Sequence, residues 1–205
     1  MMNERMFENP QTRERAILVE SARDNGGKRS VLDIEVGGGG GVMGHFHDVH
    51  QERIEVLEGV IEVTLDGVTR QVRAGQQVVV EPGQSHLWRN ASQTEVMRFR
   101  GTFTPGHPGF EAALQVLFGL ARDGETKANG FPKRLGDLAL LVKWNEGLPT
   151  GPARLLAPLL AWLARRAEAS GRAAELLRRY AVEGPTPASA PAAAAAPRHA
   201  TAGRA

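Results

Sequence analysis

Cysteine is absent from this chain of 205 residues. Disulfide bonds and thiolate metal ligands are therefore excluded, and any bound metal must be held by nitrogen and oxygen atoms. No window approaches the ~18 consecutive apolar residues that a membrane-spanning helix requires. The charged start, MMNERMFENPQTRER, has no apolar stretch behind it. We therefore expect no signal peptide and a cytoplasmic location.

A strong charge bias is also lacking, because the formal net charge is only +2. No run of basic residues is interleaved with aromatic ones, so a nucleic-acid partner is not expected. Hydrophobic residues make up 41 % of the chain and charged residues 23 %, which suits a globular core of ordinary size. The length fits one domain with an appendage.

Residues 16–103 read as short strands separated by glycine. The apolar or alternating runs are AILVE at 16–20, VLDIEV at 31–36, RIEVL at 53–57, VIEVTL at 60–65 and QVVV at 77–80. Asp66-Gly67 is typical of a two-residue hairpin turn between VIEVTL and VTRQV. Roughly seven or eight strands at this spacing predict a mainly β fold, a sandwich or a barrel.

The pattern becomes helical from Gly109 onward. One helical face is predicted by the spacing of Ala113, Leu114, Leu117, Phe118 and Ala121. Further helices are expected at 135–144 and at 154–180, with Pro158 kinking or restarting the latter. Residues 184–205 are rich in proline and alanine, and we expect them to be disordered. The expected units are an N-terminal arm (1–14), a barrel (15–104), a helical extension (105–183) and the tail.

A group of histidines lies within the strand-like region. His45 and His47 are two residues apart, so on a strand both side chains leave the same face. A loop from Asp48 to Gln51 would then oppose His47 and Glu52 across two strands, with Cβ atoms ~5 Å apart. Barrel closure would bring His86, on a later strand, to the same point. Three imidazoles and a carboxylate suit Mn, Fe, Co, Ni, Cu or Zn and leave positions for water or substrate.

The ordinary alternative is that these residues have no shared role. A lone histidine is usually a surface or satisfied core residue, and Glu52 alone would be a solvated charge. The spacing argues otherwise. Five residues separate Gly39 from His45, one separates His45 from His47, four separate His47 from Glu52, and six separate Glu52 from Gly59.

This frame resembles the first motif of the cupins, a family of jelly-roll barrels. A second cupin motif begins at Gly75 and continues through Pro82-Gly83, His86 and Asn90, with Glu81 in place of the usual proline. The resemblance covers about residues 15–104 and is to the small single-domain bacterial cupins of type 2, with an RmlC-like jelly roll. It implies one divalent transition metal (Fe, Mn, Ni, Cu or Zn) inside an open barrel end. The ligands that it implies are His45, His47, Glu52 and His86.

Strand alternation indicates which other side chains face the inferred cavity. They are Met43, Ile54, Val56, Trp88, Met97 and Phe99, whereas Arg98 and Arg100 should point outward. For Met43, Trp88, Met97 and Phe99, the favoured interpretation is that they are plain barrel core. His50, in the loop between ligands, is expected at the rim or behind the ligands.

An apolar pocket beside a metal with open positions favours an enzyme that uses O₂ on a small organic substrate, a dioxygenase-like oxidoreductase. The resemblance implies that Glu52 can leave the metal and take a substrate proton, as some family members use this position. Two alternatives remain: a non-catalytic cupin that binds a small molecule, and a metal-assisted cyclase or isomerase of small-molecule biosynthesis. The resemblance also implies a homodimer. The helical extension could cap the barrel, mediate dimerisation or, less expected, touch a membrane.

Overall fold

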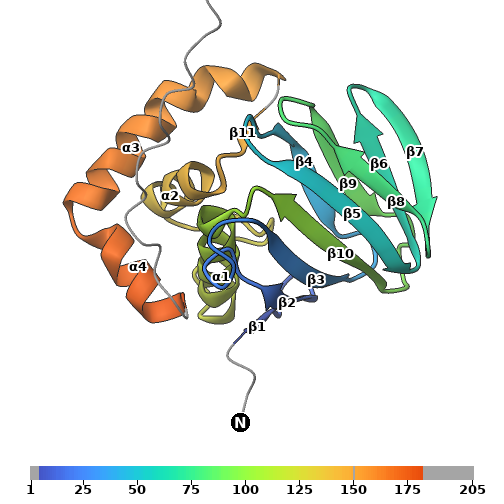
Figure 1. The fold of residues 1–205 in the computed structure, drawn as a ribbon. Coiled ribbons are helices and arrows are strands. Elements are labelled where there is room, and N and C mark those ends of the chain that lie inside the picture. Colours follow the sequence, from blue (N-terminus) through green and yellow to red (C-terminus); the bar gives the residue numbers. More distant parts are fainter. Residues whose placement is uncertain (1–4, 150, 182–205) are drawn as a thin grey trace, which may run out of the picture.

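The computed structural model describes residues 5–149 and 151–181, and Figure 1 shows two facing sheets with helices beside them. The strands are β1 (Met6–Asn9), β2 (Glu14–Glu20), β3 (Ser30–Val36), β4 (Gly41–Phe46), β5 (Gln51–Glu58), β6 (Val60–Leu65), β7 (Val68–Arg73), β8 (Gln77–Val80), β9 (His86–Asn90), β10 (Met97–Thr104) and β11 (Leu148–Pro149).

All strand pairs are antiparallel, which confirms the predicted jelly-roll architecture. One sheet has the order β1-β2-β3-β10-β5-β8 and the other the order β11-β4-β9-β6-β7. The residues between the two sheets form the main core: Val36, Ile54, Val56, Ile61, Val63, Val72, Val78, Trp88, Met97 and Phe99. Asp66 and Gly67 have φ of 47° and 85°, so the predicted hairpin between β6 and β7 is confirmed.

The strand count was underestimated. The described residues contain ten strands before residue 105 rather than seven or eight. One of the additional strands, β1, lies in the expected N-terminal arm and pairs with β2, Met6 opposite Ile17. Nine strands, β2 to β10, lie between residues 14 and 104, one more than expected; β4, with the sequence GVMGHF, is the strand that was expected to carry His45. The division of the chain into units stays a prediction.

The helices are α1 (Pro108–Arg122), α2 (Leu135–Asn145), α3 (Ala157–Ala169) and α4 (Arg172–Tyr180), with a 3₁₀ turn η1 (Gly151–Leu156) before α3. Pro158 lies in the first turn of α3, so the predicted restart is confirmed. The predicted helix over 154–180 nevertheless divides again, because Gly171 takes a left-handed φ of 80°. Among the described residues, no helix is long and apolar enough to cross a membrane. The expected disorder of 184–205 falls outside the described residues.

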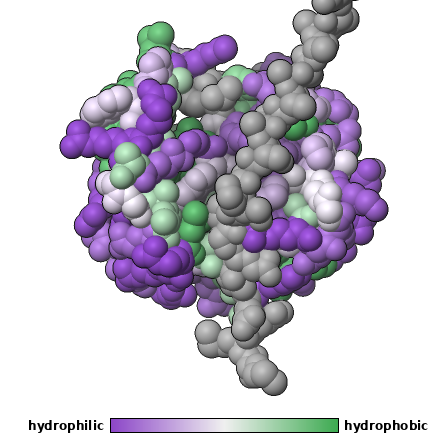
Figure 2. All heavy atoms as spheres, turned by 60° about the vertical axis from the view of Figure 1, so that its left-hand side comes forward, coloured by the Kyte–Doolittle hydropathy of each residue, from purple (hydrophilic) through white to green (hydrophobic). Residues whose placement is uncertain are grey.

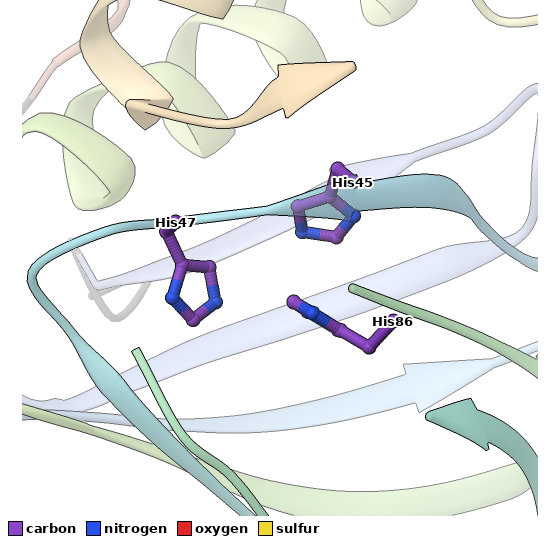
Figure 3. Close-up of side chains that lie close together, drawn as sticks. All are labelled: His45, His47 and His86. Atoms are coloured by element: carbon purple, nitrogen blue, oxygen red, sulfur yellow. The ribbon is translucent and has the colours of Figure 1, made fainter. Parts of the chain in front are cut away.

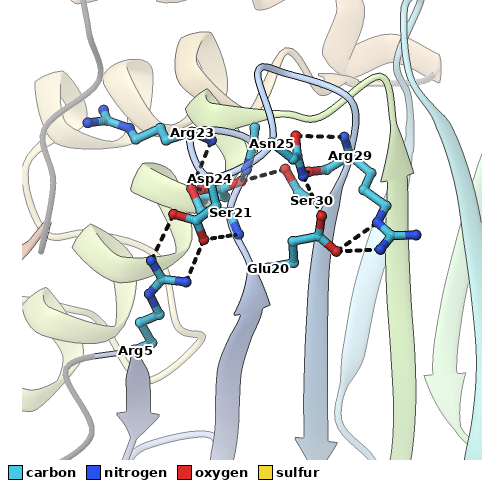
Figure 4. Close-up of polar contacts among 10 residues, drawn as sticks. Arg5, Glu20, Ser21, Arg23, Asp24, Asn25, Arg29 and Ser30 are labelled. Carbon is cyan, nitrogen blue, oxygen red and sulfur yellow. Dashed lines mark hydrogen bonds and ion pairs between the residues drawn. The ribbon is translucent and has the colours of Figure 1, made fainter.

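A buried carboxylate docks α1 against the sheets. Glu111 is 4 % exposed and accepts hydrogen bonds from Ser21 Oγ (2.6 Å), Ser30 Oγ (2.5 Å) and the Ala22 amide (2.8 Å). The connection between β2 and β3 that carries these donors has its own polar contacts (Figure 4), including the ion pair of Arg5 with Asp24. The start of α1 is therefore fixed relative to the barrel.

Candidate metal centre

Four candidate ligands come together from both sheets. His45 on β4 pairs directly with His86 at the start of β9, while Glu52 lies on β5 of the other sheet. The expectation that His47 and Glu52 face each other across a hairpin is wrong, because β4 and β5 belong to different sheets. The loop between them instead crosses from one sheet to the other. It still brings His47 Nε2 to 3.4 Å from Glu52 Oε2.

The spacing of the three histidines suits one ion, and the Glu52 carboxylate lies against two of them. Glu52 Oε2 lies 3.3 Å from His86 Nε2, close to its distance from His47 Nε2. One ring nitrogen from each of His45, His47 and His86 lies within 4.8 Å of the other two, and Figure 3 shows the three rings gathered at one point. Ligand atoms at ~2.0–2.3 Å from one metal stand roughly 3–3.5 Å apart. This buried histidine cluster can therefore hold a metal ion.

Backbone carbonyls fix the tautomer of each imidazole. The Nδ1 atoms lie 2.9 Å (His45), 2.7 Å (His47) and 3.1 Å (His86) from the carbonyl oxygens of Met43, His50 and Gln84. A carbonyl oxygen only accepts, so each Nδ1 carries the proton and each neutral ring presents the lone pair of Nε2. Hydrogen bonding of this kind orients histidines that bind metals.

Because these polar groups are buried, keeping them together costs free energy unless a cation is bound. His47 is 3 % exposed, His86 2 % and Glu52 6 %, and His86 Nε2 is a buried atom with no hydrogen-bond partner. Burial alone would raise the pKa of Glu52, but His47 and His86, when they carry a proton on Nε2, outweigh burial and lower that pKa to about 2. Burial would likewise lower the pKa of His86, but the Glu52 carboxylate raises it. The imidazole nitrogens and the Glu52 carboxylate thus face one another in a buried space. A bound cation would offset the free-energy cost of burying them.

The residues expected to line a cavity divide into two groups. Ile54, Val56, Trp88, Met97 and Phe99 are buried in the inter-sheet core. Met43 is 70 % exposed, so its predicted place inside the barrel is wrong. The register between β4 and β9 shifts between Val42 and His45, which breaks the alternation on which that prediction rested. Arg98 and Arg100 point outward as predicted, with side chains 44 % and 41 % exposed.

A second polar cluster lies behind His47, and of its members only His50 was expected near the ligands. It joins His50, His107 and Glu146, with His50 Nε2 3.4 Å from Glu146 Oε2. The His50 and His107 rings stack, 3.9 Å apart and 7° from parallel, so their in-plane lone pairs cannot converge on one ion. His107 Nδ1 also accepts from the Phe110 amide, and its Nε2 donates to Asn145 O. We interpret this cluster as a structural contact between the loop after β4, the start of α1 and the end of α2, and we call it the junction.

No spacing rule could have found this junction, because its members lie far apart in sequence. The one available signal was His107 directly before Pro108, since a polar residue followed by proline is typical of a helix start.

Comparison with known proteins places residues 31–99 in the cupin domain family. The chain is 32 % identical over 91 residues to a curated protein named polyketide synthase CurC from Streptomyces cyaneus, a match that covers 38 % of this chain and 59 % of that protein. The chain thus spans less than two thirds of the length of this relative.

Among solved structures, two examples have a similar fold. An RmlC-like cupin from Shewanella frigidimarina is 21 % identical with a TM-score of 0.43, over 51 % of this chain and 88 % of that one. Ectoine synthase from P. lautus is 20 % identical with a TM-score of 0.43, over 52 % and 72 %. These scores are too low to add to the assignment, which rests on the family match and on the two motifs. Residues 31–99 match a cupin domain, and within the described residues four α-helices follow it.

Proposed function

We propose that this protein is a metal-dependent, oxygenase-like enzyme that acts on a small organic substrate. The observation that carries the metal requirement is the set of three Nε2 lone pairs and one carboxylate that converge in a buried site. The ligand set supports Fe, Mn, Ni, Cu or Zn, because it consists of imidazole and carboxylate without sulfur.

The comparisons support a substrate class for this proposal. The relative that is 32 % identical carries the name of a polyketide synthase. The inter-sheet core, to which the strands of His86 and Glu52 also contribute, is apolar, and in it the Trp88 and Phe99 rings meet edge to face at 5.0 Å. A polyketide or a related aromatic compound fits such surroundings better than a phosphorylated sugar, which would need cationic partners.

Glu52 is the residue that we propose for proton transfer. A divalent metal held by the histidines would act as a Lewis acid and as a template that orients substrate and O₂. The lowered pKa of Glu52, about 2, keeps its carboxylate ionised at neutral pH. So low a pKa makes the carboxylate a weak base, so Glu52 would accept a proton only from a substrate hydroxyl that the metal has made more acidic.

Oxygen uptake tests this proposal. Protein loaded separately with Fe(II), Mn(II), Ni(II), Cu(II) or Zn(II) is incubated with a panel of small polyketides, beside the Glu52→Gln variant. We expect uptake by at least one metal form and a loss of ~10²-fold or more in the variant. Turnover of the panel without oxygen would contradict an oxygenase and indicate a cyclase or isomerase. Binding of a panel compound without turnover would indicate a non-catalytic binding protein.

We also propose that the protein is a homodimer. Leu155, Leu159 and Trp162 are 84 %, 51 % and 49 % exposed along η1 and α3. Figure 2 shows this side of the molecule, where hydrophobic residues lie among hydrophilic ones. Apolar side chains gathered on one face are typical of a subunit contact. Light scattering should give twice the 22.1 kDa mass of one chain; the mass of a single chain would contradict the dimer.

A further inference from the structure

A short segment after α2 lies beside the candidate metal centre. We call residues 145–149 the strap; it runs from the end of α2 through Gly147 to β11. β11 pairs with β4, Leu148 opposite Phe46 and Pro149 opposite His45. Figures 1 and 3 show β11 next to β4. The helical extension thus adds a strand to the sheet directly at a candidate ligand.

Gly147 lies in the strap beside the His45 ring. A Cβ atom at this position would stand 3.5 Å from His45 Cδ2 and 2.7 Å from Asn145 Nδ2. The first distance is ordinary van der Waals contact, and the second involves the end of a movable side chain. A side chain at 147 would therefore extend toward the His45 ring without meeting the backbone, so glycine leaves this space open.

The pattern of burial shows from which side a ligand can approach. His47, His86 and Glu52 are all buried, and His86 Nε2 has no access to solvent. His45 is the one of the four that is partly exposed. A molecule entering the site must pass on the His45 side, where the strap lies.

The junction described above holds the strap in place. His107 Nε2 donates to Asn145 O at 2.9 Å, and His50 Nε2 lies 3.4 Å from the Glu146 carboxylate. His50 in turn belongs to the loop whose carbonyl orients His47. The hydrogen bond from His107 therefore ties the strap to the start of α1, and the contact of His50 with Glu146 places the metal-binding loop beside the strap.

We propose that the strap closes the mouth of the metal centre and that Gly147 sets the size of the ligand that can enter. This inference rests on the metal site of the proposed function but not on its chemistry. Small molecules such as O₂ or azide pass Gly147 through a narrow opening that widens when the strap lifts from β4, and a larger organic substrate enters only when it has lifted.

Azide binding to the cobalt-loaded protein tests the proposal without any turnover. Stopped-flow absorption would give the association rate for the wild type, Gly147→Leu and Glu146→Ala. We expect the rate to fall at least tenfold in Gly147→Leu, with the cobalt content unchanged. It should rise in Glu146→Ala, which loses the contact with His50. Gly136→Ala is the matched control, because a Cβ there meets only Ala167 Cβ at 3.6 Å.

The outcomes separate this proposal from the proposed function. Equal azide rates in the wild type, Gly147→Leu and Glu146→Ala, with cobalt bound in all three, would refute the strap while leaving the metal site intact. Failure of the wild type to bind cobalt would refute the metal site and this inference together. A lack of oxygenase activity would change neither the azide rates nor the binding of cobalt.

Discussion

The junction behind the metal centre predicts a specific loss of stability in acid. His107 is 3 % exposed, and burial, followed by the nearby His50, lowers its pKa to about 3. In the unfolded chain the same imidazole titrates near 6.5. Below that pH the unfolded state takes up a proton that the folded state refuses, so stability falls as pH drops from about 6.5 toward 3.

The magnitude follows from the two pKa values. Between pH 7.5 and pH 5.0 the proton taken up by the unfolded chain costs about 2 kcal/mol of the free energy of unfolding. The assay is urea unfolding at both pH values, with chelator present throughout, for the wild type and His107→Asn. Asparagine keeps an acceptor for the Phe110 amide at the start of α1 but does not titrate.

The comparison of the two proteins isolates His107 from the other titrating groups. We expect the stability advantage of the wild type over His107→Asn to shrink by about 2 kcal/mol between pH 7.5 and 5.0. A difference that stays constant would mean that folded His107 accepts a proton at mildly acidic pH. The buried, stacked geometry of the junction would then be wrong.

Three further predictions concern the ligands and the helices. Because the imidazoles must be neutral to bind, metal affinity should fall as pH drops through ~6.5, and full metal retention at pH 5 in dialysed samples would contradict a three-histidine site. His50→Ala should keep most of its metal in elemental analysis, since the carbonyl that orients His47 belongs to the backbone; complete loss would make the His50 side chain a ligand. Asp137→Asn should lower the free energy of unfolding by about 3 kcal/mol, because it breaks the buried pair with Arg172 that joins α2 to α4; a change in urea unfolding below ~1 kcal/mol would show that the pair contributes little.

Sequence reasoning succeeded where local pattern and spacing carry the information. The strand runs, the Asp66-Gly67 turn and the three helical stretches follow from periodicity and turn chemistry, so they could be read residue by residue. The convergence of His45, His47 and His86 could be predicted because the spacing of the two motifs places these residues at the same end of the barrel.

The failures arise where contacts depend on the path of the chain in three dimensions. Met43 was misplaced because a register shift in β4 cannot be read from alternation. The hairpin between His47 and Glu52 was misjudged because a four-residue loop can join two strands of one sheet or cross between two sheets. Glu146 and Gly147 gave no signal, since their role comes from packing of the extension against β4.

The central claim is that His45, His47, Glu52 and His86 hold one metal ion. Elemental analysis of the purified wild type beside the His45→Ala/His86→Ala double variant tests it most directly. We predict about one equivalent of Fe, Mn, Ni, Cu or Zn in the wild type and none in the double variant. No metal in either protein, or equal metal in both, would contradict the account.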